Sequence, residues 1–240
     1  MSRVVFVASG KGGVGKSVFA SNLGATYAER GLKVVLVDMN IGLRNLDIYM
    51  GLENKVIFDV ADVLDQVVSI KKAMVRDRRF QNLYLLATTQ KREKFKAKPE
   101  DVKSLYDQLR ERFDIIIVDG PAGVNEELRI ASTGVDLAVM VATPEYVSLR
   151  DADMVEQTLR RFGVKDRVYI VNKVNKVFLA SGRLPSVETI TSIMKVPLLG
   201  IIQYDDSIHL AANCGSPIVF QGDSYITRNF NKIADRLIGY

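Results

Sequence analysis

Short apolar runs rich in β-branched residues alternate along the chain with longer segments whose apolar residues recur at helical spacing. The apolar runs predict strands over residues 3–8, 33–38, 83–87, 114–119, 136–142, 167–172 and 197–202. The helical pattern covers residues 17–30, 99–112, 148–162, 186–194 and 224–238. Because the runs are apolar on both faces and helices separate them, we predict an α/β fold: a mostly parallel sheet covered by helices on both faces.

Length and composition favour a single domain over residues 1–240. The chain is 48% hydrophobic and has no repeat and no linker rich in Pro, Gly or Ser; residues 88–98 are the most loop-like stretch. No apolar run approaches the roughly 18 residues of a membrane span, and the first residues lack the features of a signal peptide. We therefore expect a cytoplasmic protein. The single cysteine, Cys214, excludes an internal disulfide, and we expect it to be a small buried residue.

A glycine-rich loop follows the first predicted strand and opens the first predicted helix. Its sequence fits G-x-x-x-x-G-K-[ST], the phosphate-binding pattern of three-layer P-loop nucleotide hydrolases. The glycines turn backbone N–H groups toward phosphate oxygens, the lysine ammonium reaches the β and γ phosphates, and the serine hydroxyl ligates magnesium. The predicted ligand is a nucleoside triphosphate with Mg²⁺, bound by Gly10, Lys11, Gly12, Gly13, Val14, Gly15, Lys16 and Ser17.

Two aspartates support the magnesium site. Asp38 and Asp119 each end a β-branched strand, VVLVD and IIIVD. In a parallel sheet the carboxyl ends of the strands line the ligand crevice, where an acidic side chain can hold magnesium directly or through water. The predicted metal ligands are therefore Ser17, Asp38 and Asp119.

The run SGKGGVGKS resembles the deviant Walker A motif of the MinD/ParA family of ATPases, in which a second lysine, here Lys11, follows the first glycine. Residues 38–54 and 119–123 (DGPAG) resemble the two switch segments of the MinD branch. Residues 143–153 resemble its helix entry after the fifth strand, and residues 171–173 (VNK) its base-recognition strand end. The resemblance covers roughly residues 4–217. It is closer to MinD than to plasmid ParA because of the IGLRNLD and PAG runs.

Membership of this family implies an ATPase that forms an ATP-dependent sandwich dimer. Lys11 then reaches the phosphates of the partner's nucleotide, as a cation supplied in trans to the transferring phosphoryl group. The resemblance also implies that Asn172 hydrogen-bonds adenine, that Glu145 approaches the partner's ribose and that Val18 lies near the phosphates. The expected catalytic residues are Lys11, Lys16 and Asn40.

Several positions depart from the family pattern. Asn40 stands where the family has an aspartate that orients the attacking water, and an amide cannot accept the water's proton, so we expect weak hydrolysis. Val18 replaces a threonine and so removes a hydroxyl near the phosphates. The family's I-P-E-D run near the adenine is Ile-Gln-Tyr-Asp at residues 202–205, and we expect the loss of the proline to loosen that loop and to weaken base selectivity. The last helix is expected to pack on the domain through Ile226, Phe230, Ile233, Leu237 and Ile238. Membrane association at the inner face of the cell membrane then requires a further C-terminal tail or a partner.

The leading functional hypothesis is a MinD-like ATP switch that regulates division-site placement by recruiting an effector that inhibits or activates division. A ParA-like, DNA-associated positioning ATPase is an alternative, because ten basic residues between Lys71 and Lys98 face only two acidic ones, a local net charge of +8. The alternative interpretation of that stretch is a solvated helix face and loop with no binding role. A non-hydrolysing, nucleotide-dependent scaffold is a further alternative, supported by Asn40.

Overall fold

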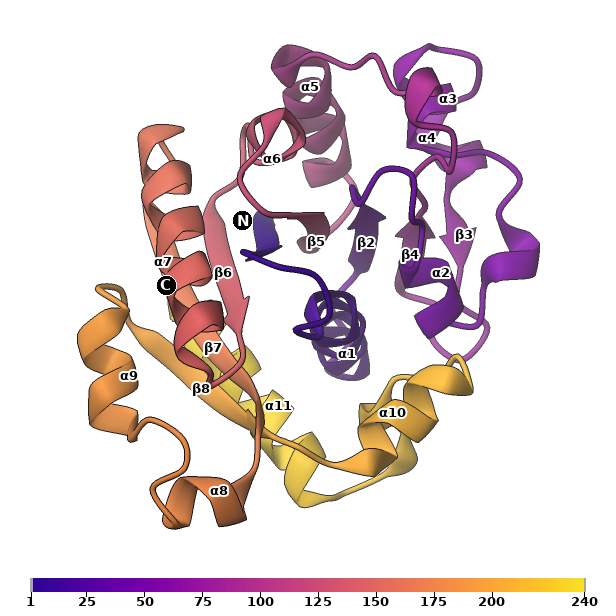
Figure 1. The fold of residues 1–240 in the computed structure, drawn as a ribbon. Coiled ribbons are helices and arrows are strands. Elements are labelled where there is room, and N and C mark those ends of the chain that lie inside the picture. The colour runs from indigo at the N-terminus through magenta and orange to yellow at the C-terminus, as the bar shows by residue number, and fades with distance from the viewer. Residues whose placement is uncertain (1, 240) are drawn as a thin grey trace.

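The computed structural model describes residues 2–239 and contains one eight-stranded sheet (Figure 1). The strand order is β3-β4-β2-β5-β1-β6-β7-β8. All neighbouring pairs are parallel except β3 and β4. The strands are β1 (Arg3–Ser9), β2 (Val34–Asp38), β3 (Val75–Arg76), β4 (Leu83–Leu86), β5 (Ile115–Ala122), β6 (Leu137–Ala142), β7 (Asp166–Val174) and β8 (Leu198–Gln203).

The seven predicted strands and five predicted helices are all present, with bounds that differ by a few residues, and the predicted α/β class is confirmed. The long helices are α1 (Lys16–Glu29), α5 (Pro99–Arg110), α7 (Tyr146–Arg161) and α11 (Tyr225–Ile238), with α9 (Val187–Ile193) shorter. The pattern missed β3 and several short elements, because segments this short give no measurable period. These are α2 (Leu46–Tyr49), α3 (Val60–Leu64), α4 (Ile70–Ala73), α6 (Glu126–Ala131), α8 (Lys176–Ala180), η1 (Glu53–Lys55), η2 (Arg92–Lys94) and η3 (Ile218–Gln221). The helical run that leads to Cys214 is α10 (Asp206–Asn213).

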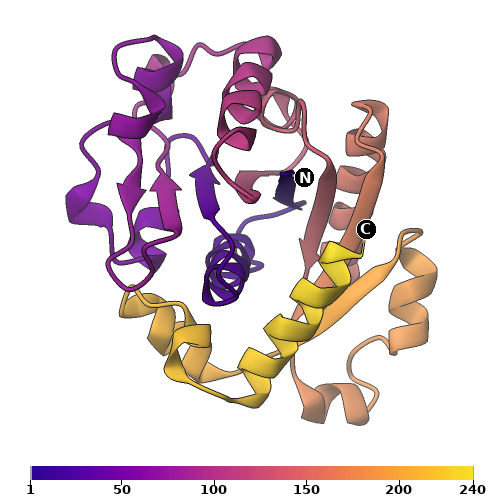
Figure 2. The same ribbon diagram turned by 180° about the vertical axis from the view of Figure 1, so that it is seen from behind.

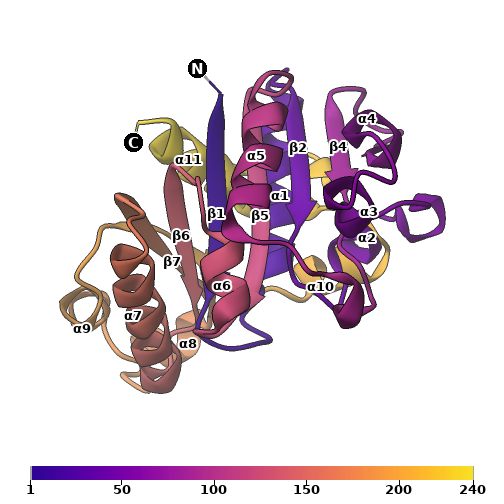
Figure 3. The same cartoon turned by 90° about the horizontal axis from the view of Figure 1, so that it is seen from above.

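Alternate residues of each central strand pack into two separate apolar layers. Val5 and Val7 of β1 join the layer built with α1 and α11, whereas Val4 and Phe6 join the layer built with α5 and α7. Figure 2 shows α1 and α11 on their side of the sheet, and Figure 3 shows α5, α6 and α7 on the other. The sheet is therefore buried on both faces, as its uninterrupted apolar strands require.

Two expectations about single residues near the C-terminal end are wrong. Cys214, expected to be buried, is exposed at the end of α10. Helix α11 buries Ile226, Phe230, Ile233 and Leu237 as expected, but Ile238 is exposed because it falls outside the buried stripe. Among the described residues, no helix is long and apolar enough to cross a membrane.

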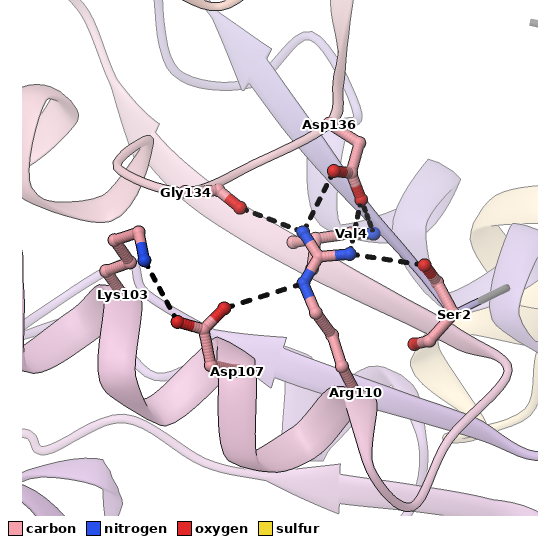
Figure 4. Close-up of polar contacts among 7 residues, drawn as sticks. All are labelled: Ser2, Val4, Lys103, Asp107, Arg110, Gly134 and Asp136. Carbon is pink, nitrogen blue, oxygen red and sulfur yellow. Dashed lines mark hydrogen bonds and ion pairs between the residues drawn. The ribbon is translucent and has the colours of Figure 1, made fainter.

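An ion-pair network ties α5 to the amino ends of β1 and β6 (Figure 4). The Arg110 guanidinium donates to both carboxylate oxygens of Asp136, at 2.7 and 2.9 Å, and to the carbonyls of Ser2 and Gly134. The same Asp136 carboxylate accepts the backbone N–H of Val4 at 2.7 Å. This network lies at the end of the strands opposite the glycine-rich loop, so it stabilises the sheet without reaching the loop.

Candidate nucleotide-binding site

The glycine-rich loop connects β1 to α1, as its sequence predicts. Gly15 caps the helix with φ 93°, a left-handed conformation that favours glycine, and its Cα faces the Asn172 amide so closely that a Cβ would come within 2.3 Å of Nδ2. Gly10 approaches α7 just as closely, because a Cβ there would lie 2.4 Å from the Cβ of Asp151. Two glycines are thus required by the close approach of neighbouring elements.

The loop lines a cavity of about 380 Å³. Of the predicted site residues, Lys11, Gly12, Gly13, Val14, Gly15, Lys16, Ser17, Val18, Asn40 and Asn172 line this cavity. Gly10, Asp38, Asp119 and Glu145 do not form its lining. The two aspartates are buried behind the loop, whereas Glu145 is exposed at the start of α7. Glu145 is exposed and does not line the cavity of its own protomer, so its side chain is accessible to a second copy. The contact between Glu145 and the partner's ribose stays a prediction.

Lys16 and Asp119 form a buried ion pair beneath the loop. The Lys16 Nζ lies 2.7 Å from Asp119 Oδ1, and both side chains are almost fully buried. The other oxygen, Asp119 Oδ2, is buried and has no hydrogen-bond partner among residues 2–239. A buried carboxylate oxygen without a partner is costly unless something binds it. Asp119 therefore has one oxygen available for a cation or for a water bound to one.

Asp38 stands beside Asp119, since the two residues are register partners on β2 and β5. Its carboxylate accepts the backbone N–H groups of Asn40, at 2.8 Å, and of Leu46, at 3.2 Å. Burial and the neighbouring Asp119 charge raise the pKa of Asp38 to about 7. Two buried carboxylates facing one lysine leave a surplus of negative charge, which a divalent cation can neutralise.

These residues fit a magnesium ion bound together with phosphates. Magnesium prefers oxygen ligands, and the carboxylates of Asp38 and Asp119 and the Ser17 hydroxyl supply them. Among the described residues, no group of three or more His, Cys, Asp and Glu side chains is arranged to hold a metal ion alone. The donor set is thus of the kind that holds magnesium through a nucleotide's phosphates and water rather than in an all-protein cage.

The strand end at residues 171–173 contacts the phosphate loop directly. The Asn172 Nδ2 donates to the Val14 carbonyl at 2.8 Å, and the next residue, Lys173, has φ 58° and donates from Nζ to the Gly13 carbonyl at 2.7 Å. Tyr204, within the run at residues 202–205, lines the cavity as well. Sequence reasoning did not assign His209 to the site, although it also lines the cavity, because no motif marks it and it reaches the loop only through the tertiary fold.

The basic stretch from Lys71 to Lys98 is partly paired within the fold. Arg79 pairs with Asp77, Arg92 with Glu127, and Lys94 with both Asp59 and Asp62; Arg76 donates to Gln81, and the Lys72 ammonium lies over the Phe58 ring. Seven basic residues of the stretch are exposed and make no ion pair among residues 2–239: Lys71, Lys72, Arg76, Arg78, Lys91, Lys96 and Lys98. Ion pairs therefore neutralise only Arg79, Arg92 and Lys94 of the stretch.

Comparison with known proteins places this site in a family. Residues 5–218 match the model of the CobQ/CobB/MinD/ParA nucleotide binding domain. The septum site-determining protein MinD of Synechocystis is 40% identical over 240 residues, which are all of this chain and 90% of that protein.

Two solved structures share the fold over nearly their whole length. The MinC:MinD cell division protein complex of Aquifex aeolicus contains a chain with a TM-score of 0.92 and 35% identity, covering 100% of this chain and 96% of that one. The septum site-determining protein MinD of Pyrococcus horikoshii, complexed with Mg-ADP, has a TM-score of 0.88 and 29% identity, covering 99% of this chain and 96% of that one. The family match over most of the chain, the relatives and the geometry of the loop agree: this chain belongs to the CobQ/CobB/MinD/ParA nucleotide-binding family and is MinD-like within it.

Proposed function

We propose that this chain is a MinD-like switch that binds ATP with Mg²⁺, pairs with a second copy of itself and regulates the placement of the division site through a recruited partner. The observation that carries the proposal is the phosphate loop, whose residues from Lys11 to Ser17 line one cavity above the buried pair of Lys16 and Asp119. The names of the relatives and the MinC-bound structure from Aquifex support the process and a division inhibitor as the partner class. The Mg-ADP complex from Pyrococcus supports the ligand.

Nucleotide binding exchanges the partners of Lys16. The β and γ phosphates would replace Asp119 as the acceptors of the Lys16 ammonium, and Asp119 and Ser17 would then hold the magnesium ion, which would supply positive charge to the phosphates. Each group that loses a protein partner on nucleotide binding would gain a ligand partner, and the cation would offset the negative charge left over by Asp38 and Asp119 in the ligand-free protein. Lys11, half exposed on the outer part of the loop, is free to reach the nucleotide of a second copy.

ATP hydrolysis by this switch is slow because Asn40 stands at the position of the water-orienting aspartate. Asn40 lines the cavity and its backbone N–H donates to Asp38, which supports the proposal that its amide orients the attacking water. An amide can hydrogen-bond the attacking water but cannot take its proton. Phosphate release by the Asn40→Asp variant should exceed that of the parent chain by about 10-fold or more, within the range of a general base. An unchanged rate would refute the assignment.

The oligomeric state tests the switch itself. Size-exclusion chromatography with ATP, ADP and no nucleotide should give a dimer only with ATP. Lys11→Ala should bind ATP and remain a monomer, whereas Lys16→Ala should lose nucleotide binding altogether. A parent chain that is monomeric in all three conditions would overturn the proposal that Lys11 acts in trans.

A second candidate, a non-hydrolysing scaffold, rests on the same Asn40. It differs from the slow ATPase only in turnover, so single-turnover phosphate release measured over hours, with and without lipid vesicles, separates the two. We place the proposed switch in the cytoplasm, with peripheral association at the inner face of the cell membrane through a further C-terminal tail or through a partner protein.

A further inference from the structure

An arginine outside the cavity packs on the turn that carries Asn40. The Leu43 N–H closes this turn by donating to the Asn40 carbonyl at 3.2 Å, and Gly42, between them, has φ 87°. The Arg92 side chain lies directly on Gly42, because a Cβ at that glycine would come within 2.8 Å of Arg92 Nε and 2.9 Å of Cγ. The Gly42 N–H also donates to the Thr89 carbonyl at 3.0 Å. The loop after β4 therefore holds this turn through its backbone and through one side chain.

An acidic residue on another element fixes Arg92 in turn. The Arg92 Nη1 donates to Glu127 Oε1 at 2.9 Å, and Glu127 lies in the first turn of α6. Helix α6 is itself held against α5, because the buried Tyr106 hydroxyl donates to the Ala131 carbonyl at 2.8 Å. Arg92 is 65% exposed and does not line the cavity. Its stem thus lies on the turn while its head is anchored to the packed helices beyond.

The direction of the Asn40 amide depends on this turn. Asn40 lines the cavity and its backbone N–H donates to Asp38, whereas its side-chain amide makes no hydrogen bond within residues 2–239. An amide cannot accept the proton of the attacking water, so Asn40 can contribute only by placing that water. A misplacement of about 1 Å can cost about 100-fold in rate. A contact that fixes the turn therefore also fixes the placement of the water.

We propose that Arg92 is a positioning residue for ATP hydrolysis: it holds the turn at Gly42 so that the Asn40 amide meets the attacking water, and Glu127 keeps it in place. The inference rests on the ATPase switch proposed above. Because Arg92 does not line the cavity, its loss should slow turnover and leave ATP affinity unchanged. Exposed ion pairs add little to stability, so variants at this pair should remain folded.

The test is single-turnover phosphate release from Mg-ATP by the full chain, with calorimetric ATP affinity measured on the same proteins. Arg92→Ala should lower the rate by about 10-fold or more and keep ATP affinity within about twofold of the parent. Arg92→Lys keeps the stem and the charge and should retain at least about one third of the parent rate, although an ammonium lacks the planar fork. Lys91→Ala is the matched control and should behave as the parent, because Lys91 is exposed and makes no ion pair among residues 2–239.

A mutant cycle shows whether Glu127 acts through Arg92. Glu127→Gln keeps the shape of the side chain but removes its charge, and it should slow phosphate release. The double variant Arg92→Ala/Glu127→Gln should be no slower than Arg92→Ala alone, because Glu127 then has no arginine to hold. Additive losses would mean that Glu127 serves the reaction by another route and would overturn its anchoring role.

Hydrogen exchange of the ATP-bound chain gives a readout that does not depend on turnover. The amides of residues 41–44 should exchange faster in Arg92→Ala than in the parent, whereas those of β5 should not change. An unchanged rate of phosphate release, or unchanged exchange in residues 41–44, would refute the positioning role and leave the nucleotide switch standing.

The remaining outcomes separate this role from the proposed function. A loss of ATP affinity or of the ATP-dependent dimer in Arg92→Ala would place Arg92 in binding or assembly and would refute the positioning role. A parent that binds ATP but releases no phosphate would refute it as well, since there would be no attacking water to place. A parent that binds no nucleotide at all would overturn the proposed function itself.

Discussion

Replacing Arg79 with alanine should cost the protein a substantial part of its stability, although the sequence presents Arg79 as one more member of a basic surface stretch. The guanidinium chelates the buried Asp77 carboxylate at 2.6 and 3.0 Å and donates to the carbonyls of Met50, at 2.7 Å, and Gly215, at 3.1 Å. It also lies over the Phe220 ring, 4.9 Å from the centroid. One side chain thus joins β3, the end of α2 and the turn after α10.

The expected cost follows from the partners that alanine leaves behind. Removing one member of a fully buried ion pair costs about 3–5 kcal/mol, but the Arg79 side chain is 33% exposed, so the lower end of that range applies. The two carbonyls lose charged donors, each worth about 1 kcal/mol, although water can replace part of that loss. We expect Arg79→Ala to lower the free energy of unfolding by about 3 kcal/mol, and we expect Asp77→Asn to lower it by less.

Urea unfolding followed by circular dichroism measures this loss, and a double-mutant cycle between Arg79 and Asp77 isolates their pairwise coupling. Arg78→Ala is the control, because Arg78 is adjacent to Arg79 in the sequence but is exposed and makes no ion pair among residues 2–239. The Arg78→Ala substitution should change the free energy of unfolding by no more than about 0.5 kcal/mol. A loss below about 1 kcal/mol for Arg79→Ala, or a coupling near zero, would refute the reasoning. Such a result would mean that the Arg79 guanidinium is available to bind nucleic acid.

Four further outcomes follow from the geometry. Gly10→Ala should weaken ATP binding by about 10-fold or more, because its Cβ would lie 2.4 Å from the Cβ of Asp151; an unchanged titration curve would contradict this. Mg-ATP affinity should rise between pH 6 and pH 8 as Asp38, with its pKa raised to about 7, loses the proton that competes with magnesium. The raised pKa of Asp38 also stabilises the ligand-free protein at low pH, and this stabilisation is lost as the pH rises through about 7. Urea unfolding midpoints measured at pH 5 and pH 8 would show the loss. Arg110→Ala should destabilise the fold by about 1–2 kcal/mol through loss of the partly exposed pair with Asp136 and leave ATP affinity unchanged; altered affinity would mean that the far end of the sheet is coupled to the site.

The fold class and the phosphate site could be predicted from the sequence because both depend on patterns of residues that are neighbours in the chain. A buried strand needs a short apolar run and a helix needs a period of 3.6, so the seven strands and five longer helices could be located from neighbouring residues alone. The run from Gly10 to Ser17 is equally local: its turn, its helix start and its lysine lie within one stretch of chain. The local pattern failed for β3 and α2, whose few residues carry no period.

Tertiary structure decided which side chains meet across long separations in the chain. Nothing near Arg79 in the sequence indicates that its partners include Gly215, and nothing near His209 indicates that it lines the same cavity as the phosphate loop. Those contacts depend on sheet order, which places β8 two strands beyond β6 and β2 on the opposite side of β1. A local pattern states which residues are apolar or charged. The packing of distant elements decides which charges are neutralised and which rings are left open to a ligand.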